Sequence, residues 1–218
     1  MDRIQILPDS VKKKIAAGEV VEGPFSVVKE LVENSIDAGA TEIEVEVFES
    51  GLKKLVVRDN GAGIHRDDVA LALMEHATSK IRDIADIERI GSFGFRGEAL
   101  SSIAEISRIT MYTRTEGAEA GARLAYREGS LEMSDYAGPA GTTIIVENLF
   151  YNTPARKKFM KSKTVEMRNI RAVFLRMAIA HPGIRFSLLS EGKQGIRLER
   201  VSTLEERMEQ VYGADTLK

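Results

Sequence analysis

The chain has 218 residues, of which 43% are hydrophobic and 29% are charged, so we expect a soluble globular protein with one large domain or two small ones. A net charge of −2 gives no overall attraction to nucleic acid, and the absence of cysteine excludes disulfides, thiolate metal sites and a cysteine nucleophile. No apolar run reaches the roughly 20 residues that span a bilayer, and no signal-peptide pattern is present, so we expect a cytoplasmic protein.

The first strong helical pattern, at residues 27–39, has a polar stripe made of side-chain oxygens. Glu30, Glu33, Asn34 and Asp37 stand at i, i+3, i+4 and i+7, so they share one face of the helix. Valine, leucine and isoleucine supply the other face, and a glycine is placed to end the helix. Such an oxygen-rich face suits a hard cation and an activated water, although a solvated acidic surface gives the same pattern.

The elements that follow favour hairpins. Residues 41–48 alternate apolar with acidic side chains, and Ser50 and Gly51 then turn into a second apolar run at residues 55–57, which predicts a β-hairpin with one wet face. Two helices are expected next, at about residues 66–75 and from Glu98, on either side of a glycine-rich connection. The later pattern predicts strands at 106–113, 123–126, 131–136 and 142–147, a helix at 165–180, and a closing hairpin at 184–189 and 194–201. This order predicts an α+β sandwich.

The final segment, residues 202–218, begins like another helix. Thr203 stands before Glu205 and Glu206, as in a capped first turn rich in acid. Two interpretations stay open: a terminal helix docked on the domain, or the start of a truncated second domain.

The segment from Asp59 to Gly63 reads Asp-Asn-Gly-Ala-Gly and follows the second strand of the hairpin. These residue types dominate tight turns for backbone reasons alone. The functional interpretation is that glycine lets a flat ligand approach the backbone, while the Asp59 carboxylate accepts a hydrogen bond from an exocyclic amine such as that of adenine.

Two further segments suit phosphate groups. Thr78, Ser79 and Lys80 offer two hydroxyls and one ammonium, although a plain helix end explains them equally well, and the neighbouring His76 is expected to be structural. Residues 91–100 are rich in glycine and lead into a helix, so they could present backbone N–H groups to an anion, or simply form a surface loop. This segment is neither a Walker A loop nor a dinucleotide fingerprint.

A basic segment, residues 156–163, lies between a strand and a helix and encloses one aromatic side chain. Its members are Arg156, Lys157, Lys158, Phe159, Lys161 and Lys163. Two interpretations of this segment are open: a loop whose charges are solvated, or a surface that contacts nucleic-acid phosphates. Any DNA binding should be weak, sequence-tolerant and strongly salt-dependent.

In this order the segments resemble one family. Residues 15–21, 30–39, 59–63, 76–80, 94–100 and 150–156 look like the motifs of the N-terminal ATPase region of MutL-type DNA mismatch repair proteins, which belong to the wider GHKL group with gyrase B, Hsp90 and sensor histidine kinases. The resemblance runs from about Ile4 to the last residue. The acidic helix and the Asp59 turn are shared across the wider group, whereas the amino-acid sequences of residues 94–100 and 152–156 are similar to those of MutL-type proteins alone.

The resemblance implies a fold and residue roles. The fold is a two-layer α/β sandwich of the GHKL (Bergerat) type, with a mixed, mainly antiparallel sheet covered by helices on one face. Glu30 matches the general base, Asn34 the Mg²⁺ ligand, Asp59 the carboxylate that reads adenine, and Thr143 the hydroxyl that supports it. The implied ATP contacts are Asn34, Ala38, Asp59, Gly63, Thr78, Ser79, Lys80 and Thr143, together with the lid residues Gly94, Phe95, Arg96, Gly97, Glu98, Ala99 and Leu100.

The resemblance also implies an organisation and partners. Residues 1–21 match an arm exchanged in a dimer, 22–201 the ATP-binding domain, and 202–218 the start of a second (transducer) subdomain. ATP and Mg²⁺ would order the lid and drive dimerisation, with a mobile lid and arm and a monomer in the absence of nucleotide. DNA and a MutS-type mismatch-recognition protein are the implied partners, near the bacterial nucleoid.

In the family the second subdomain supplies a lysine to the γ-phosphate, and the chain ends before it, so hydrolysis should be very slow. The alternatives are a type II topoisomerase ATPase subunit, a histidine kinase domain that phosphorylates a partner histidine, or a nucleotide switch without significant turnover.

Overall fold

The computed structural model describes residues 5–74, 76–78 and 97–213. Its helices are α1 (Asp9–Val20), α2 (Pro24–Asp37), α4 (Ala99–Ile106), α5 (Pro154–Lys158), α6 (Lys163–Ala180) and α7 (Leu204–Tyr212), with 3-10 turns η1 (Glu49–Gly51), η2 (Arg66–Asp68) and η3 (Leu71–Leu73). Its strands are β1 (Glu42–Phe48), β2 (Lys54–Asp59), β3 (Arg108–Arg114), β4 (Gly121–Arg127), β5 (Ser130–Tyr136), β6 (Gly141–Glu147), β7 (Arg185–Ser190) and β8 (Lys193–Leu198).

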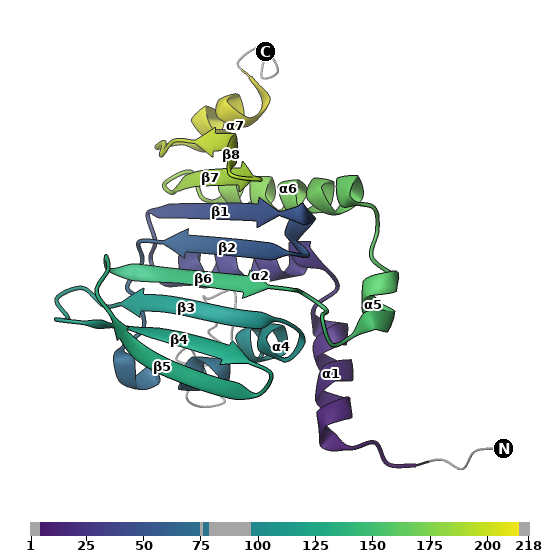
Figure 1. Ribbon diagram of the computed structural model, residues 1–218. Coiled ribbons are helices and arrows are strands. Elements are labelled where there is room, and N and C mark those ends of the chain that lie inside the picture. Colours follow the sequence, from purple (N-terminus) through teal and green to yellow (C-terminus); the bar gives the residue numbers. More distant parts are fainter. Residues whose placement is uncertain (1–4, 75, 79–96, 214–218) are drawn as a thin grey trace, which may run out of the picture.

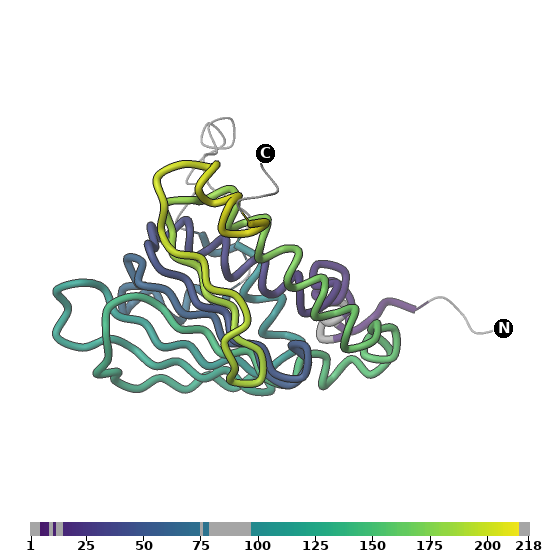
Figure 2. The backbone as a smooth tube through the Cα atoms, turned by 90° about the horizontal axis from the view of Figure 1, so that it is seen from above, coloured from purple at the N-terminus to yellow at the C-terminus, as the bar shows by residue number. Residues whose placement is uncertain are grey.

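The strands form one eight-stranded sheet in the order β5-β4-β3-β6-β2-β1-β7-β8. Strands β1 and β7 pair in parallel, and the other neighbouring strands pair antiparallel. Helices α2, α4 and α6 pack against one face of this sheet, as Figures 1 and 2 show. The prediction of a two-layer sandwich with a mixed, mainly antiparallel sheet is therefore confirmed.

The register of the sheet separates a helix-covered face from an open face. Val45, Val57 and Ile144 lie side by side on β1, β2 and β6, and each is at most 7% exposed. One residue further along, Arg58 pairs with Thr143, and because side chains alternate along a strand, these two belong to the open face. A shift of one residue in this register would move the whole apolar set out of the core.

Helix α2 covers most of the helix predicted at residues 27–39, but it begins earlier, at Pro24, and ends at Asp37. Pro24 occupies the first turn, where its missing N–H costs nothing, and Leu31 and Val32 bury completely against the sheet and core. The helix ends before Gly39, which has φ +72°. The acidic and amide side chains of the predicted polar stripe therefore project from a helix whose opposite face is anchored.

The helix predicted at residues 66–75 is wrong. The described residues there form two separate 3-10 turns, η2 and η3. Val69 is fully buried, but Leu71 and Met74 are about half exposed, at 47% and 55%. Most helical stability in proteins comes from packing of an apolar face, and this segment has too little buried surface to support a continuous α-helix.

A helix lies near each end of the described chain. Helix α1 forms most of the arm region and packs against α4, with Ala17 buried, whereas Ile6 before it is 91% exposed. Helix α7 begins with the predicted capped first turn, in which Thr203 and Glu206 form a capping box. Its Arg207 is fully buried and donates hydrogen bonds to the carbonyls of the α6–β7 connection, so α7 is docked on this domain. None of the described helices combines the length and apolar character needed to cross a membrane.

Candidate nucleotide site

Asp59 ends β2 with its carboxylate turned toward α2. Its Oδ2 accepts a hydrogen bond from Ser35 Oγ at 2.8 Å, and its Oδ1 accepts from the backbone N–H groups of Gly61 at 2.9 Å and Thr142 at 3.3 Å. Burial raises the pKa of Asp59, and these three donors act in the opposite direction because they favour the ionised form. A carboxylate offers about four acceptor positions, so three donors leave room for one more from a ligand.

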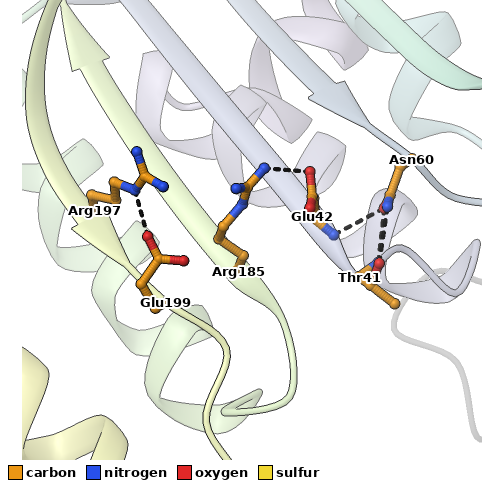
Figure 3. Close-up of polar contacts among 6 residues, drawn as sticks. All are labelled: Thr41, Glu42, Asn60, Arg185, Arg197 and Glu199. Carbon is orange, nitrogen blue, oxygen red and sulfur yellow. Dashed lines mark hydrogen bonds and ion pairs between the residues drawn. The ribbon is translucent and has the colours of Figure 1, made fainter. Parts of the chain in front are cut away.

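The neighbouring Asn60 has a different task. Its Oδ1 accepts from the backbone N–H groups of Thr41 and Glu42, both at 2.9 Å, and its Nδ2 donates to Thr41 Oγ1 at 2.9 Å (Figure 3). Glu42 is also paired with Arg185 of β7. Asn60 therefore ties the end of β2 to the start of β1, which holds the turn that carries Asp59.

Gly63 lets this turn lie directly against β3. Its φ is +71°, and a Cβ there would lie 2.2 Å from the carbonyl oxygen of Arg114, so no other residue fits without moving backbone. The next N–H, of Ile64, donates to Thr113 Oγ1 at 2.8 Å. The close packing of this turn against β3 therefore requires a glycine at position 63, independently of any ligand.

The polar stripe of α2 is not uniform. Glu33 is only 8% exposed, and burial raises its pKa, an effect partly offset by Lys29, whose Nζ lies 3.1 Å from Glu33 Oε2. The same Nζ lies 3.2 Å from Glu30 Oε1, but the Glu30 side chain keeps 29% exposure. Asn34, one turn after Glu30, and Ala38 are half-buried. Glu30 is therefore the better placed of the two glutamates to meet solvent and a ligand.

Thr143 is not brought to Asp59. It pairs with Arg58 and Tyr112, on the open face of the sheet. The neighbouring Thr142 pairs with Asp59 instead, donates its N–H to that carboxylate, and is 8% exposed. The hydroxyl on the helix-covered side is thus that of Thr142, which lies 3.0 Å from Thr113 Oγ1.

The two predicted phosphate segments are described only in part. Ser79, Lys80, Gly94, Phe95 and Arg96 lie outside the described residues. The described ends of the two segments contact each other. His76 Nδ1 lies 3.4 Å from Glu98 Oε1, and a Cβ on Gly97, whose φ is +62°, would lie 2.4 Å from the carbonyl oxygen of Ala77.

Helix α4 starts directly after this contact. The Glu98 carbonyl accepts from Ser101 Oγ at 3.0 Å and from the Ser102 N–H at 2.9 Å, which begins the helix at Ala99. Leu100 packs on the core, and Thr78 is half-buried. The expected lid is therefore anchored at its C-terminal end by a packed helix.

The metal prediction rests on one side chain. Within the described ranges, no group of three or more His, Cys, Asp or Glu side chains could hold a metal ion. Mg²⁺ usually takes few protein ligands and completes its octahedron with waters and substrate phosphates. A single amide oxygen from Asn34, on the polar face of α2, fits that mode of binding.

Ser35 is the site residue that sequence reasoning missed. It lies in α2 between Asn34 and Ile36 and is 3% exposed, and its single hydroxyl hydrogen has two acceptors within reach, Asp59 Oδ2 at 2.8 Å and the carbonyl of Leu31 at 3.1 Å. A signal was present, because Ser35 stands four residues after Leu31 on the apolar face, and a buried hydroxyl needs a partner.

Replacing Ser35 with alanine is expected to weaken nucleotide binding about tenfold, because a hydrogen bond to a charged group is worth about 1.5 kcal/mol or more. The matched control is Ser26→Ala, since Ser26 is also a buried serine of α2, at 8% exposure. Titration with an ATP analogue measures both. Equal affinities for the two variants would show that the Ser35 hydroxyl does not organise the site.

Comparison with known proteins agrees with this arrangement. The family model of histidine kinase-, DNA gyrase B-, and HSP90-like ATPases matches residues 22–140. The chain belongs to this ATPase family, as the sheet, the acidic helix and the Asp59 turn also indicate.

Within the family, the similarity is to MutL. The chain is 49% identical to the DNA mismatch repair protein MutL of Streptococcus thermophilus and 48% identical to that of Streptococcus pneumoniae. In both cases the match covers 100% of this chain and 34% of the relative, so the chain spans about a third of the length of these relatives.

Solved structures give the same result. The Aquifex aeolicus MutL ATPase domain complexed with ADP superposes with a TM-score of 0.72 at 34% identity, covering 88% of this chain and 70% of that one. The N-terminal domain of a DNA repair protein gives a TM-score of 0.79 at 30% identity, covering 94% and 61%. The resemblance read from the motifs is therefore confirmed.

Proposed function

We propose that this chain is the ATP-binding and slowly ATP-hydrolysing region of a MutL-type DNA mismatch repair protein. The observation that carries the proposal is the hydrogen bond between Ser35 and Asp59, because it joins the helix of Glu30 and Asn34 to the carboxylate at the end of β2. A relative of known structure was solved with ADP, which supports nucleotide as the ligand.

In the proposed mechanism, Asp59 accepts a hydrogen bond from the exocyclic amine of adenine, and Thr142 and Gly61 hold its carboxylate in place. Asn34 would hold Mg²⁺, which supplies charge neutralisation to the phosphates when bound. Glu30 accepts a proton from the attacking water. Helix α2 keeps Glu30 and Asn34 one turn apart, so positioning contributes more than covalent chemistry.

The proposal is tested by phosphate release from ATP with Mg²⁺ and with Mg²⁺ chelated. We expect slow release that stops on chelation. Release that is independent of Mg²⁺ would contradict the role of the metal, and ATP binding with no release in either condition would favour the alternative of a nucleotide switch without turnover.

The proposed working cycle is a nucleotide-gated clamp. ATP would order the lid before α4 and favour a homodimer through the N-terminal arm, with a monomer in the absence of nucleotide. One feature supports the arm as a contact surface: apolar side chains including Ile6 and Ile15 are exposed, at 91% and 48%. A MutS-type protein at the bacterial nucleoid is the proposed partner.

The basic segment, residues 156–163, is proposed to bind DNA. Its four lysines are exposed and Phe159 is 85% exposed, whereas Arg156 turns inward and donates to the carbonyl of Val21 at 3.4 Å. We expect weak binding to single-stranded oligonucleotides that falls steeply with salt, and a smaller salt slope for Lys157→Ala combined with Lys158→Ala. Fluorescence anisotropy measures both, and an unchanged slope would remove these lysines from the interface.

A further inference from the structure

Glu166, in the first turn of α6, has an unusual environment for a carboxylate. The residue is 2% exposed, and its Oε1 accepts a hydrogen bond from the backbone N–H of Lys161 at 3.1 Å. Its Oε2 is buried and has no hydrogen-bond partner within the described part of the chain. Among the residues that the structure describes, no lysine or arginine forms an ion pair with it. An ionised group in such a place needs another source of positive potential.

The start of α2 supplies that potential. Glu166 Oε2 lies 3.4 Å from where a Cβ of Gly23 would be, and Gly23 is the N-cap residue of α2. No described side chain caps the α2 N-terminus with a hydrogen bond, and the first turn of α2 contains no acidic residue. A helix N-terminus carries about half a positive elementary charge, so an anion beside it is stabilising.

Helices α2 and α6 also run side by side in the same direction. They pack together; Glu166 and Gly23 meet at their N-terminal ends, and His181 at the end of α6 interacts electrostatically with Asp37 at the end of α2. Parallel neighbours place two positive helix ends together, which is unfavourable. One buried carboxylate between the two ends offsets this repulsion.

We propose that Glu166 is a positioning residue, whose buried carboxylate fixes the N-terminus of α2 against α6 and thereby sets the placement of Glu30 and Asn34. The expected effect on nucleotide binding rests on the proposed function. The anchoring of α2 by Glu166 does not depend on that function. The bond from Lys161 N–H also makes Glu166 the link between α2 and the loop that carries the basic segment.

The test variant is Glu166→Gln, which keeps the size and the acceptor for Lys161 but removes the charge. The control is Glu205→Gln, because Glu205 is also a first-turn glutamate, in α7, but is exposed. Amide hydrogen exchange of residues 26–31 should become about tenfold faster in Glu166→Gln, as loss of a partly buried helix-end charge implies. Exchange of the sheet amides and of the control should match the parent.

A second measurement separates positioning from plain stability. At a temperature where both variants are folded, Glu166→Gln should bind a Mg²⁺-ATP analogue several-fold more weakly than the parent, and Glu205→Gln should bind equally. Unchanged exchange in α2, or faster exchange spread evenly over the sheet with parental affinity, would overturn the proposal. If the parent itself binds no nucleotide, the proposed function fails, whereas the exchange comparison still decides the role of Glu166 in α2.

Discussion

Replacement of Glu30 by alanine should abolish ATP hydrolysis while ATP binding persists. A positioned general base contributes about 10²- to 10⁴-fold to rate, so the loss should fall in that range. Glu30 lies one turn before Asn34 on the polar face of α2 and keeps 29% exposure beside Lys29, so its removal leaves the buried face of the helix intact. Single-turnover phosphate release measures the rate, and calorimetry measures the affinity.

The variant Glu30→Gln is the isosteric companion to this experiment, because it preserves the shape of the side chain and removes the base. Both variants should behave alike. Hydrolysis at the parental rate in either would contradict the assignment and direct attention to Glu33 or to a switch without turnover.

Replacement of Asp59 by asparagine should have the opposite profile, with nucleotide binding lost and the fold retained. The amide keeps an oxygen for the N–H groups of Gly61 and Thr142, but it no longer presents an anionic acceptor to the adenine amine. We therefore expect affinity to fall by about a hundredfold or more, as when a buried charged hydrogen-bond partner is lost.

We also predict the direction in which Asp59→Asn changes the stability of the fold. Burial raises the pKa of Asp59 in the folded protein, so its proton is bound more tightly in the folded than in the unfolded chain. Protonated Asp59 therefore adds to the free energy of unfolding at pH values below the ordinary pKa of aspartate. This contribution is lost as the pH rises through the raised pKa of the folded protein. At neutral pH the neutral asparagine should therefore be at least as stable as the parent. A large drop in Tm would contradict this account.

Sequence reasoning predicted the local parts of the fold well. The β1–β2 hairpin follows from alternation around a short turn, and α2 follows from a regular apolar face. The pairing of β1 with β7, in parallel, involves segments more than 130 residues apart in sequence, which no local pattern encodes. The helix prediction at residues 66–75 was wrong for a similar reason. The stability of a helix there would depend on burial, which only tertiary packing determines.

The site shows the same division. Asp59 and the glycines of its turn form a common turn sequence when taken alone, and they became candidate site residues through the family resemblance. The choice between Thr142 and Thr143 depends on a strand register of one residue, which the sequence leaves open. Ser35 escaped notice because its partner Asp59 lies 24 residues away, although its position on the apolar face was visible.

Calorimetric titration decides whether this chain binds ATP where α2 meets the end of β2. The parent and Asp59→Asn would be titrated side by side with a non-hydrolysable ATP analogue and Mg²⁺. We expect a saturable heat for the parent that is lost in Asp59→Asn, with both proteins folded. Equal binding by the two proteins, or no binding by the parent, would contradict it.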